Sequence, residues 1–287
     1  MDPQTASRPY SRPRSRARRL VWGLGVIALG LLFLMPLATM LGGSFREAGL
    51  PPPTGVELIP AEPSTEGYER AVSLVPLARA VGNSLWVAVA FTAVAVLSAS
   101  WAGYGLTLAG PRTTRRVVIL LVVVLMVPVS AVWLGRFAIL HAAGLTDTFF
   151  PLILPALVGG SPLFVLLYYL AFRRIPRDVL DAARLEGAGA WGTWRRVAMP
   201  LVRGTSLAVG LLAFAISWGN FIDPLLYLSD ERLHTAPLAL RSLEQLGPTN
   251  WPVLLAGAVL VTAPVIAASA AALRLIVPRR GTGWLGG

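Results

Sequence analysis

Apolar residues along this chain gather into six long runs that are separated by polar segments. The runs cover residues 20–41, 83–109, 117–140, 149–172, 205–228 and 251–276. Each is roughly 20 residues or more, which is the length that crosses the hydrocarbon core of a bilayer as a helix. The pattern therefore predicts an all-α, polytopic membrane protein with six transmembrane helices.

The arginines indicate how these helices are oriented. All 25 basic residues are arginine, and nineteen of them lie before Leu20, in 110–116, in 173–203 or in 274–280. Short basic loops stay on the cytoplasmic side of a membrane, so both termini are predicted to be cytoplasmic. The net charge of +11 is then a consequence of topology and not a sign of nucleic-acid binding, with contact to anionic membrane lipid as a second consequence.

The segments outside the runs differ in composition. Residues 1–19, rich in Arg, Pro and Ser, are predicted to form a disordered basic cytoplasmic tail. Residues 42–79 contain several prolines and form the predicted extracytoplasmic loop, while 277–287 form a cytoplasmic tail. The first run is longer than the core of a typical signal peptide and lacks a convincing cleavage site, so it is predicted to be an uncleaved anchor.

The segment 173–203 is a polar, arginine-rich island between two apolar runs. Pro176 suits the first turn of a helix, and a short helix is predicted over 178–186. Gly187 follows it, at the usual place for a left-handed C-cap. One face of this helix carries Val179, Ala182, Ala183 and Glu186. Since a helix of about nine residues is marginal alone in water, we expect it to dock on a cytoplasmic partner.

The island resembles the cytoplasmic loop of ATP-binding-cassette importer permeases, in which E-A-A is followed by acidic-Gly-Ala and, about a dozen residues later, by Pro-Leu. The matching residues are Asp181, Ala182, Ala183, Glu186, Gly187, Ala188, Pro200 and Leu201. Asp181 replaces the usual Glu and Glu186 the more usual Asp, and both replacements keep the charge. The segments GLTDT (144–148), NSL (83–85), SWGNF (217–221) and TAPLALRSL (235–243) resemble carbohydrate-type permeases of the maltose transporter G-subunit group.

The resemblance implies the type I ABC importer permease architecture, with a permease core over 80–276 and a bacterial plasma membrane location. It also implies that the loop forms a coupling helix seated in a cleft of an ATPase subunit. The implied partners are a second, different permease, two copies of an ATP-binding subunit, an extracytoplasmic solute-binding protein and a sugar. The C-terminal GTGWLGG is similar to the glycine-rich tail of the family but stops short of its final Lys-Gly.

ATP hydrolysis is predicted to belong to a partner subunit. A P-loop needs a lysine that reaches the β- and γ-phosphates of ATP, and this chain contains no lysine. The chain is therefore expected to be a transport subunit and not an enzyme, with no cofactor of its own, while ATP and Mg²⁺ bind to the partner.

Two polar residues are candidates for the translocation path, namely Asn220 and Asp223 near the outer half of the fifth run. An acidic residue at membrane depth is by default a functional candidate, although Asp223 could also lie at the wet interface beside Pro224. Arg136, near the outer end of the third run, is expected to be interfacial. Asp181 has two possible roles: contact with a partner protein, or favourable placement of a negative charge near the positive N-terminal end of the helix dipole.

Two other functions are considered. The chain could import another solute, such as a polyamine, phosphate or an amino acid; the resemblance of SWGNF and TAPLALRSL favours sugar. A membrane-embedded enzyme would need paired carboxylates, a histidine cluster or a Ser/His constellation within the spans. Asp223 is the only acidic residue within the six runs, and the sequence indicates no partner for it.

Overall fold

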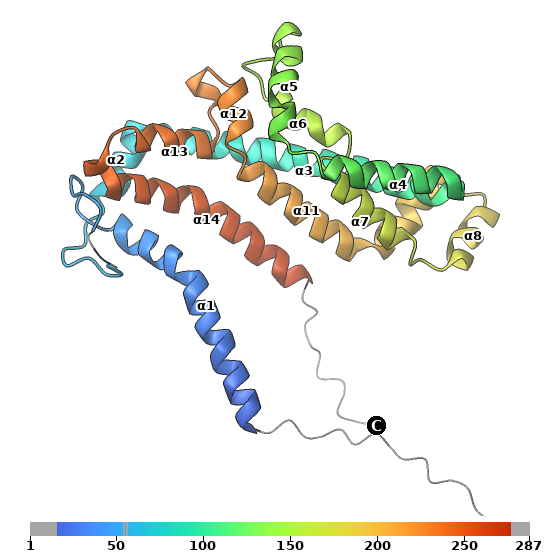
Figure 1. The fold of residues 1–287 in the computed structure, drawn as a ribbon, viewed down its shortest axis with the longest axis horizontal. Coiled ribbons are helices and arrows are strands. Elements are labelled where there is room, and N and C mark those ends of the chain that lie inside the picture. Colours follow the sequence, from blue (N-terminus) through green and yellow to red (C-terminus); the bar gives the residue numbers. More distant parts are fainter. Residues whose placement is uncertain (1–15, 54, 56, 277–287) are drawn as a thin grey trace, which may run out of the picture.

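The computed structural model describes residues 16–53, 55 and 57–276, and the regular structure of these residues is entirely helical (Figure 1). The helices are α1 (Arg16–Ser44), α2 (Glu66–Leu74), α3 (Leu77–Leu108), α4 (Pro111–Leu125), α5 (Ser130–Ala142), α6 (Phe150–Leu157), α7 (Pro162–Phe172), α8 (Arg177–Leu185), α9 (Ala190–Thr193), α10 (Met199–Leu201), α11 (Arg203–Trp218), α12 (Ile222–Tyr227), α13 (Ala236–Glu244) and α14 (Trp251–Ile276). A π-helix, Trp194–Ala198, joins α9 to α10, and 3₁₀ turns lie at Glu231–Leu233 and Pro248–Asn250. The predicted all-α class is confirmed.

The residues that the structure describes contain between four and six candidate membrane spans. Val21–Ser44, Leu77–Leu108, Phe150–Phe172 and Trp251–Ala271 are each long and apolar enough to cross a bilayer. Two further pairs of helices pass the same criterion together but are sharply bent, which accounts for the upper limit of six. Most of the tail predicted to be disordered (1–19) and the whole of the tail 277–287 lie outside the described residues, although α1 already begins at Arg16.

The run 117–140 does not form one straight helix. It is divided between α4 and α5, whose axes are bent by 97°. Pro128 lies in the break. Proline has no N–H to donate, and its ring clashes with the carbonyl four residues earlier, which explains why the helix stops here.

The run 205–228 is also interrupted. α11 ends at Trp218 and α12 starts at Ile222. In the gap, the Asn220 side-chain oxygen accepts a hydrogen bond of 3.2 Å from the backbone N–H of Asp223. Such a side-chain acceptor offers the backbone an alternative to a continuous helix. A second bend, of 85°, lies at the start of α11.

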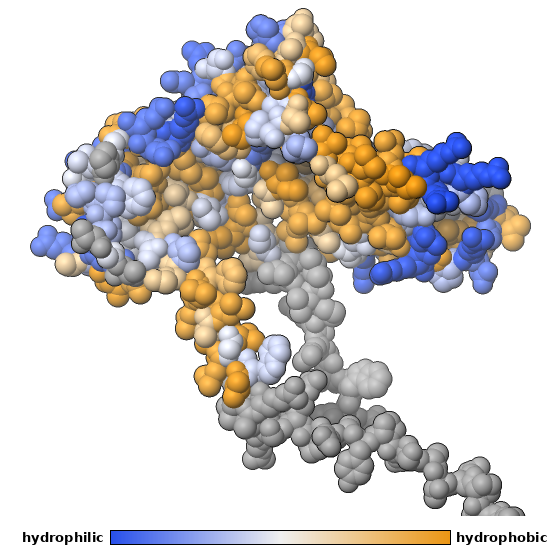
Figure 2. Space-filling model, in the orientation of Figure 1, coloured by the Kyte–Doolittle hydropathy of each residue, from blue (hydrophilic) through white to orange (hydrophobic). Residues whose placement is uncertain are grey.

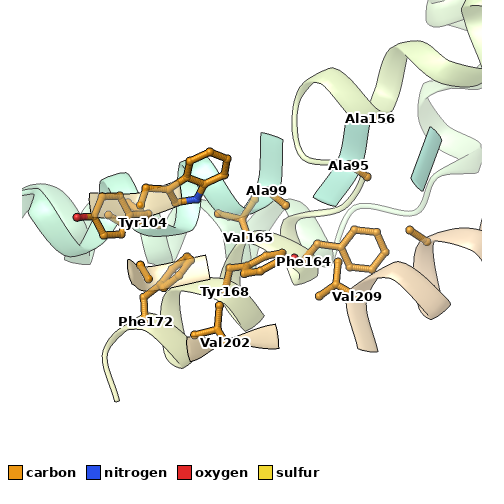
Figure 3. Packing of buried hydrophobic residues seen from close by; sticks show 14 of the residues in the cluster. Ala95, Ala99, Tyr104, Ala156, Phe164, Val165, Tyr168, Phe172, Val202 and Val209 are labelled. Atoms are coloured by element: carbon orange, nitrogen blue, oxygen red, sulfur yellow. The ribbon is translucent and has the colours of Figure 1, made fainter. Parts of the chain in front are cut away.

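The core is built around α3, which packs against α7 and α11. Figure 3 shows Ala95 and Ala99 on α3 near Phe164 and Val165 on α7. Gly103 allows the closest approach, since a Cβ there would lie 2.7 Å from Cβ of Tyr168. Small residues on one helix thus let the backbone of the next come near, as is usual for helices packed in a membrane.

Large apolar surfaces remain uncovered within this chain. The apolar window of α1 is 0% buried, and α4 contains no buried residue. Figure 2 shows hydrophobic residues over most of the visible face, with hydrophilic residues gathered at its ends. Exposed apolar surface of this extent is expected to be covered by lipid or by another protein.

The proline-rich loop 42–79 contains one helix, α2. Its first residue, Glu66, donates its backbone N–H to Ser64 Oγ over 3.1 Å and forms an i,i+4 ion pair with Arg70. The Tyr68 hydroxyl lies 2.7 Å from Ser44 Oγ and links the loop to the end of α1. The loop is therefore tied to the helices.

Segments that resemble the carbohydrate-type permeases meet in space. Asn83 Nδ2, in the NSL segment, donates to two backbone carbonyls of the loop that precedes α13, at 2.9 and 3.0 Å. Ser84 Oγ accepts a buried hydrogen bond of 2.8 Å from the backbone N–H of Ala236, in TAPLALRSL. Asp147, in GLTDT, has a left-handed φ of 54° and accepts hydrogen bonds from the backbone of residues 229 and 230. These contacts join α3 to the loop before α13, and the loop after α5 to the residues that follow α12, away from α8 (Figure 1).

Candidate functional site

The short helix of the arginine-rich island is α8, and its bounds agree with the predicted range 178–186 to within one residue. Gly187 has a φ of 85°, so the predicted left-handed C-cap is confirmed. Its N–H donates to the carbonyl of Arg184 over 2.9 Å, and the N–H of Ala188 donates to that of Ala183 over 3.0 Å. These two hydrogen bonds form a Schellman motif, which satisfies carbonyls at the end of the helix.

α8 projects from the end of the helical body and is mostly exposed (Figure 1). Asp181, Ala182, Glu186 and Gly187 are exposed, whereas Ala183 is only 9% exposed and packs against the chain itself. The face predicted from Val179, Ala182, Ala183 and Glu186 is therefore not wholly free. Asp181 lies 3.0 Å from Nη1 of Arg184, so the aspartate charge is shared with its own helix.

The segment that follows α8 is anchored by three tryptophans. Trp191 and Trp194 have ring centroids 4.6 Å apart, and Trp101 of α3 lies 5.1 and 5.3 Å from them, edge-on to both. Trp194 is only 3% exposed. Thr193, fully buried, donates its hydroxyl to the carbonyl of Gly189 over 3.1 Å. α9 and the π-helix thus form a packed base from which α8 extends.

The remaining matched residues lie on both sides of that base. Ala188 is half-buried between α8 and α9, while Pro200 and Leu201 are exposed on α10, Leu201 by 57%. Both ends of the matched pattern therefore have surface that another protein could contact.

The residues predicted for the translocation path belong to a polar cluster formed by α5, α12 and the gap before α12. Asn220 Nδ2 donates to Asp223 Oδ2 over 2.9 Å. The other carboxylate oxygen of Asp223 lies 2.5 Å from Nη2 of Arg136. Arg136 also donates from Nε to the Tyr227 hydroxyl over 2.9 Å, and its guanidinium lies 5.3 Å from the centre of that ring. The cluster neutralises the aspartate and fastens α12 to α5.

Both charged side chains are largely shielded by the rest of the chain. The side chain of Asp223 is 13% exposed and that of Arg136 is 23% exposed. Arg136 was expected to be interfacial, and the structure shows it as the partner that the sequence did not indicate. No local spacing could have revealed this contact, because the two residues lie on helices far apart in the sequence.

Residues 95–281 match the family described as "Binding-protein-dependent transport system inner membrane component". The chain is 27% identical over 247 residues to the arabinooligosaccharides transport system permease protein AraQ of Halalkalibacterium halodurans, covering 85% of this chain and 88% of the relative. It is 30% identical over 206 residues to the sulfoquinovosyl glycerol transport system permease protein SmoH of Agrobacterium fabrum, covering 72% of each.

The fold also has a solved counterpart. A chain in the crystal structure of a bacterial ABC transporter involved in the import of the acidic polysaccharide alginate superposes with a TM-score of 0.75 at 18% identity. The match covers 94% of this chain and 100% of that chain. The two chains therefore share a fold along nearly their whole length.

Proposed function

The chain belongs to the family of inner membrane components of binding-protein-dependent transport systems, and we propose that it is a permease subunit of an ATP-driven importer for a sugar or oligosaccharide. The observation that carries the proposal is an exposed, capped helix, α8, whose residues match the cytoplasmic loop pattern of such permeases. Relatives that cover most of the chain are named for the transport of arabinooligosaccharides and sulfoquinovosyl glycerol, which favours a carbohydrate.

In the proposed topology the chain crosses the bacterial plasma membrane six times, with α4–α5 and α6–α7 each forming one interrupted crossing. The other crossings are α1, α3, α11 and α14. Both termini and α8 are then cytoplasmic, which agrees with the positions of the arginines. Broken helices are tolerated at membrane depth where neighbouring helices satisfy the freed backbone groups.

α8 is proposed to be the coupling helix that sits in a cleft of the ATPase subunit. A stiff base and an exposed tip suit this role, because the tryptophan-anchored segment would move together with α3 when the tip is pushed. The contact residues proposed are Asp181, Ala182, Glu186, Gly187, Pro200 and Leu201, with Ala183 and Ala188 shaping the loop from behind.

ATP-driven closure of two ATPase subunits would then shift this permease and a second, different one from an inward-facing to an outward-facing state. Moving such an equilibrium from 1:99 to 99:1 requires about 5.5 kcal/mol, and α8 would transmit that bias. A solute-binding protein would deliver the sugar on the outer side. Asn220 and Asp223 are proposed to border the translocation path, with Arg136 balancing the aspartate charge.

Co-purification of the tagged chain from its native membrane tests the proposal. We expect an ATPase subunit and a second permease to accompany it, with vanadate-sensitive ATP hydrolysis that a transported sugar stimulates through its binding protein. A chain that purifies alone in mild detergent, with no associated ATPase activity, would contradict the proposal.

The coupling role has its own test in this complex. Asp181→Asn is expected to reduce sugar-stimulated ATP hydrolysis and transport together, whereas Asp178→Asn, which removes the same charge from the first turn of α8, should leave both near normal. If both variants changed ATP hydrolysis and transport to the same extent, Asp181 would have no specific role in coupling and would only stabilise the helix.

A further inference from the structure

A groove of about 910 Å³ lies where the start of α4, the end of α7 and α8 meet. Four arginines line it: Arg115 of α4, Arg173 directly after α7, and Arg177 and Arg184 of α8. The only carboxylate among the lining residues is Asp181. The side chains that line the groove therefore have a formal net charge of +3, directly beside the apolar membrane helices.

Three of these arginines have free donors. Asp181 pairs with Arg184, and within the described part of the chain Arg115, Arg173 and Arg177 have no carboxylate within 4.0 Å. The guanidinium of Arg173 lies 5.6 Å from the centre of the Tyr169 ring, which can support one face of the group while its N–H donors stay free. Guanidinium groups in such a set are suited to bind a phosphate.

The wall of the groove is apolar as well as basic. Val118, Leu170, Ile175 and Leu180 line it beside the arginines. Figure 2 shows hydrophilic residues at the end of the molecule that carries α8, directly beside the hydrophobic surface of the membrane helices. A free anion would contact the arginines alone, whereas an anionic amphiphile would use both kinds of surface.

We propose that this groove binds the headgroup of an anionic phospholipid. The lipid phosphate lies among Arg115, Arg173 and Arg177, and the upper acyl segments lie against the apolar wall. Basic pockets between membrane helices on the cytoplasmic side favour anionic headgroups, and a zwitterionic lipid would bring its own cation among the arginines. The lipid also supplies contacts to α8, of which only Ala183 is buried. The site does not depend on which solute is carried.

The test uses the 287-residue chain together with its co-purifying subunits, in mild detergent. Native mass spectrometry follows the titration of phosphatidylglycerol and, separately, of phosphatidylcholine. The groove variant combines Arg115→Gln, Arg173→Gln and Arg177→Gln. The control combines Arg116→Gln, Arg174→Gln and Arg195→Gln, which remove the same charge from positions that do not line the groove.

We expect the control to bind phosphatidylglycerol like the unmodified protein and the groove variant to bind it roughly 100-fold more weakly, since each arginine near a membrane surface contributes about fivefold. A triple Arg→Lys variant of the groove should retain most of the binding, which separates lost charge from lost folding.

Four outcomes would overturn the proposal. Equal losses in the groove variant and the control would indicate diffuse attraction, and equal affinity for phosphatidylcholine would exclude headgroup selection. Displacement of the lipid by inorganic phosphate at a similar concentration would identify a simple anion site. Binding by the isolated chain but not by the assembled complex would assign the groove to a protein contact.

Discussion

The ion pair between Arg136 and Asp223 makes a measurable prediction about how α5 and α12 are held together. Their charged atoms are 2.5 Å apart and the side chains are 23% and 13% exposed. With an effective dielectric constant of about 20, unit charges about 4 Å apart attract by about 4 kcal/mol. Desolvation offsets much of this attraction, so we expect a coupling free energy of about 1–3 kcal/mol.

Two substitutions and their combination isolate this coupling. Asp223→Asn removes the charge but can keep the hydrogen bond from Asn220, whereas Arg136→Met keeps the aliphatic stem and also loses the hydrogen bond to Tyr227. Each single change leaves one partly buried charge without its partner and should destabilise the protein by about 2–4 kcal/mol. This is somewhat less than the roughly 3–5 kcal/mol lost when a fully buried ion pair is broken. The double variant should lose about 1–3 kcal/mol less than the sum of the singles.

The free energy of unfolding is measured for all four proteins in mixed micelles with increasing denaturing detergent. The exposed pair formed by Arg70 and Glu66, with side chains 46% and 38% exposed, serves as the control, and its coupling should be about 0.3–0.5 kcal/mol. Additive effects at Arg136 and Asp223, or a coupling no larger than that of the exposed pair, would refute the reasoning.

Three further substitutions test other parts of the structure. Gly187→Ala forces a side chain into a left-handed conformation and should cost about 1–2 kcal/mol, which is measured as faster amide exchange in α8. The control Gly189→Ala, at a φ of −65° with open space around it, should leave that exchange unchanged. Equal exchange rates in the two variants would contradict the role of Gly187 as a C-cap. Gly103→Ala should destabilise the α3–α7 packing by about 1–3 kcal/mol. The control Gly105→Ala, whose new Cβ would meet nothing within 4 Å, should be neutral or stabilising. The unfolding assay described above measures both variants, and equal free energies of unfolding would contradict the close packing at Gly103. Trp101→Leu removes two edge-on contacts worth about 0.5–1.5 kcal/mol each and should speed amide exchange in the π-helix, and unchanged exchange would mean that the tryptophan cluster does not anchor it.

Features with local causes were predictable from the sequence alone. Long apolar runs predicted an all-helical membrane protein, because backbone groups in lipid must be satisfied within a helix or a closed barrel. The short helix at 178–186 and the left-handed conformation of Gly187 were also predictable, since helix ends depend on a few neighbouring residues. The spacing of the loop residues pointed to the correct family for the same reason, as it is a pattern within one short segment.

Features with distant causes required the tertiary structure. The runs 117–140 and 205–228 are predominantly apolar, and hydropathy does not distinguish a straight helix from one broken at Pro128 or after Trp218. The partner of Asp223 and the meeting of NSL with TAPLALRSL depend on residues far away in the chain; one of the hydrogen bonds made by Asn83 spans 149 positions. A residue's type and its neighbours determine which local conformation it prefers, but only the packing of whole helices decides which charges meet and which surfaces stay open.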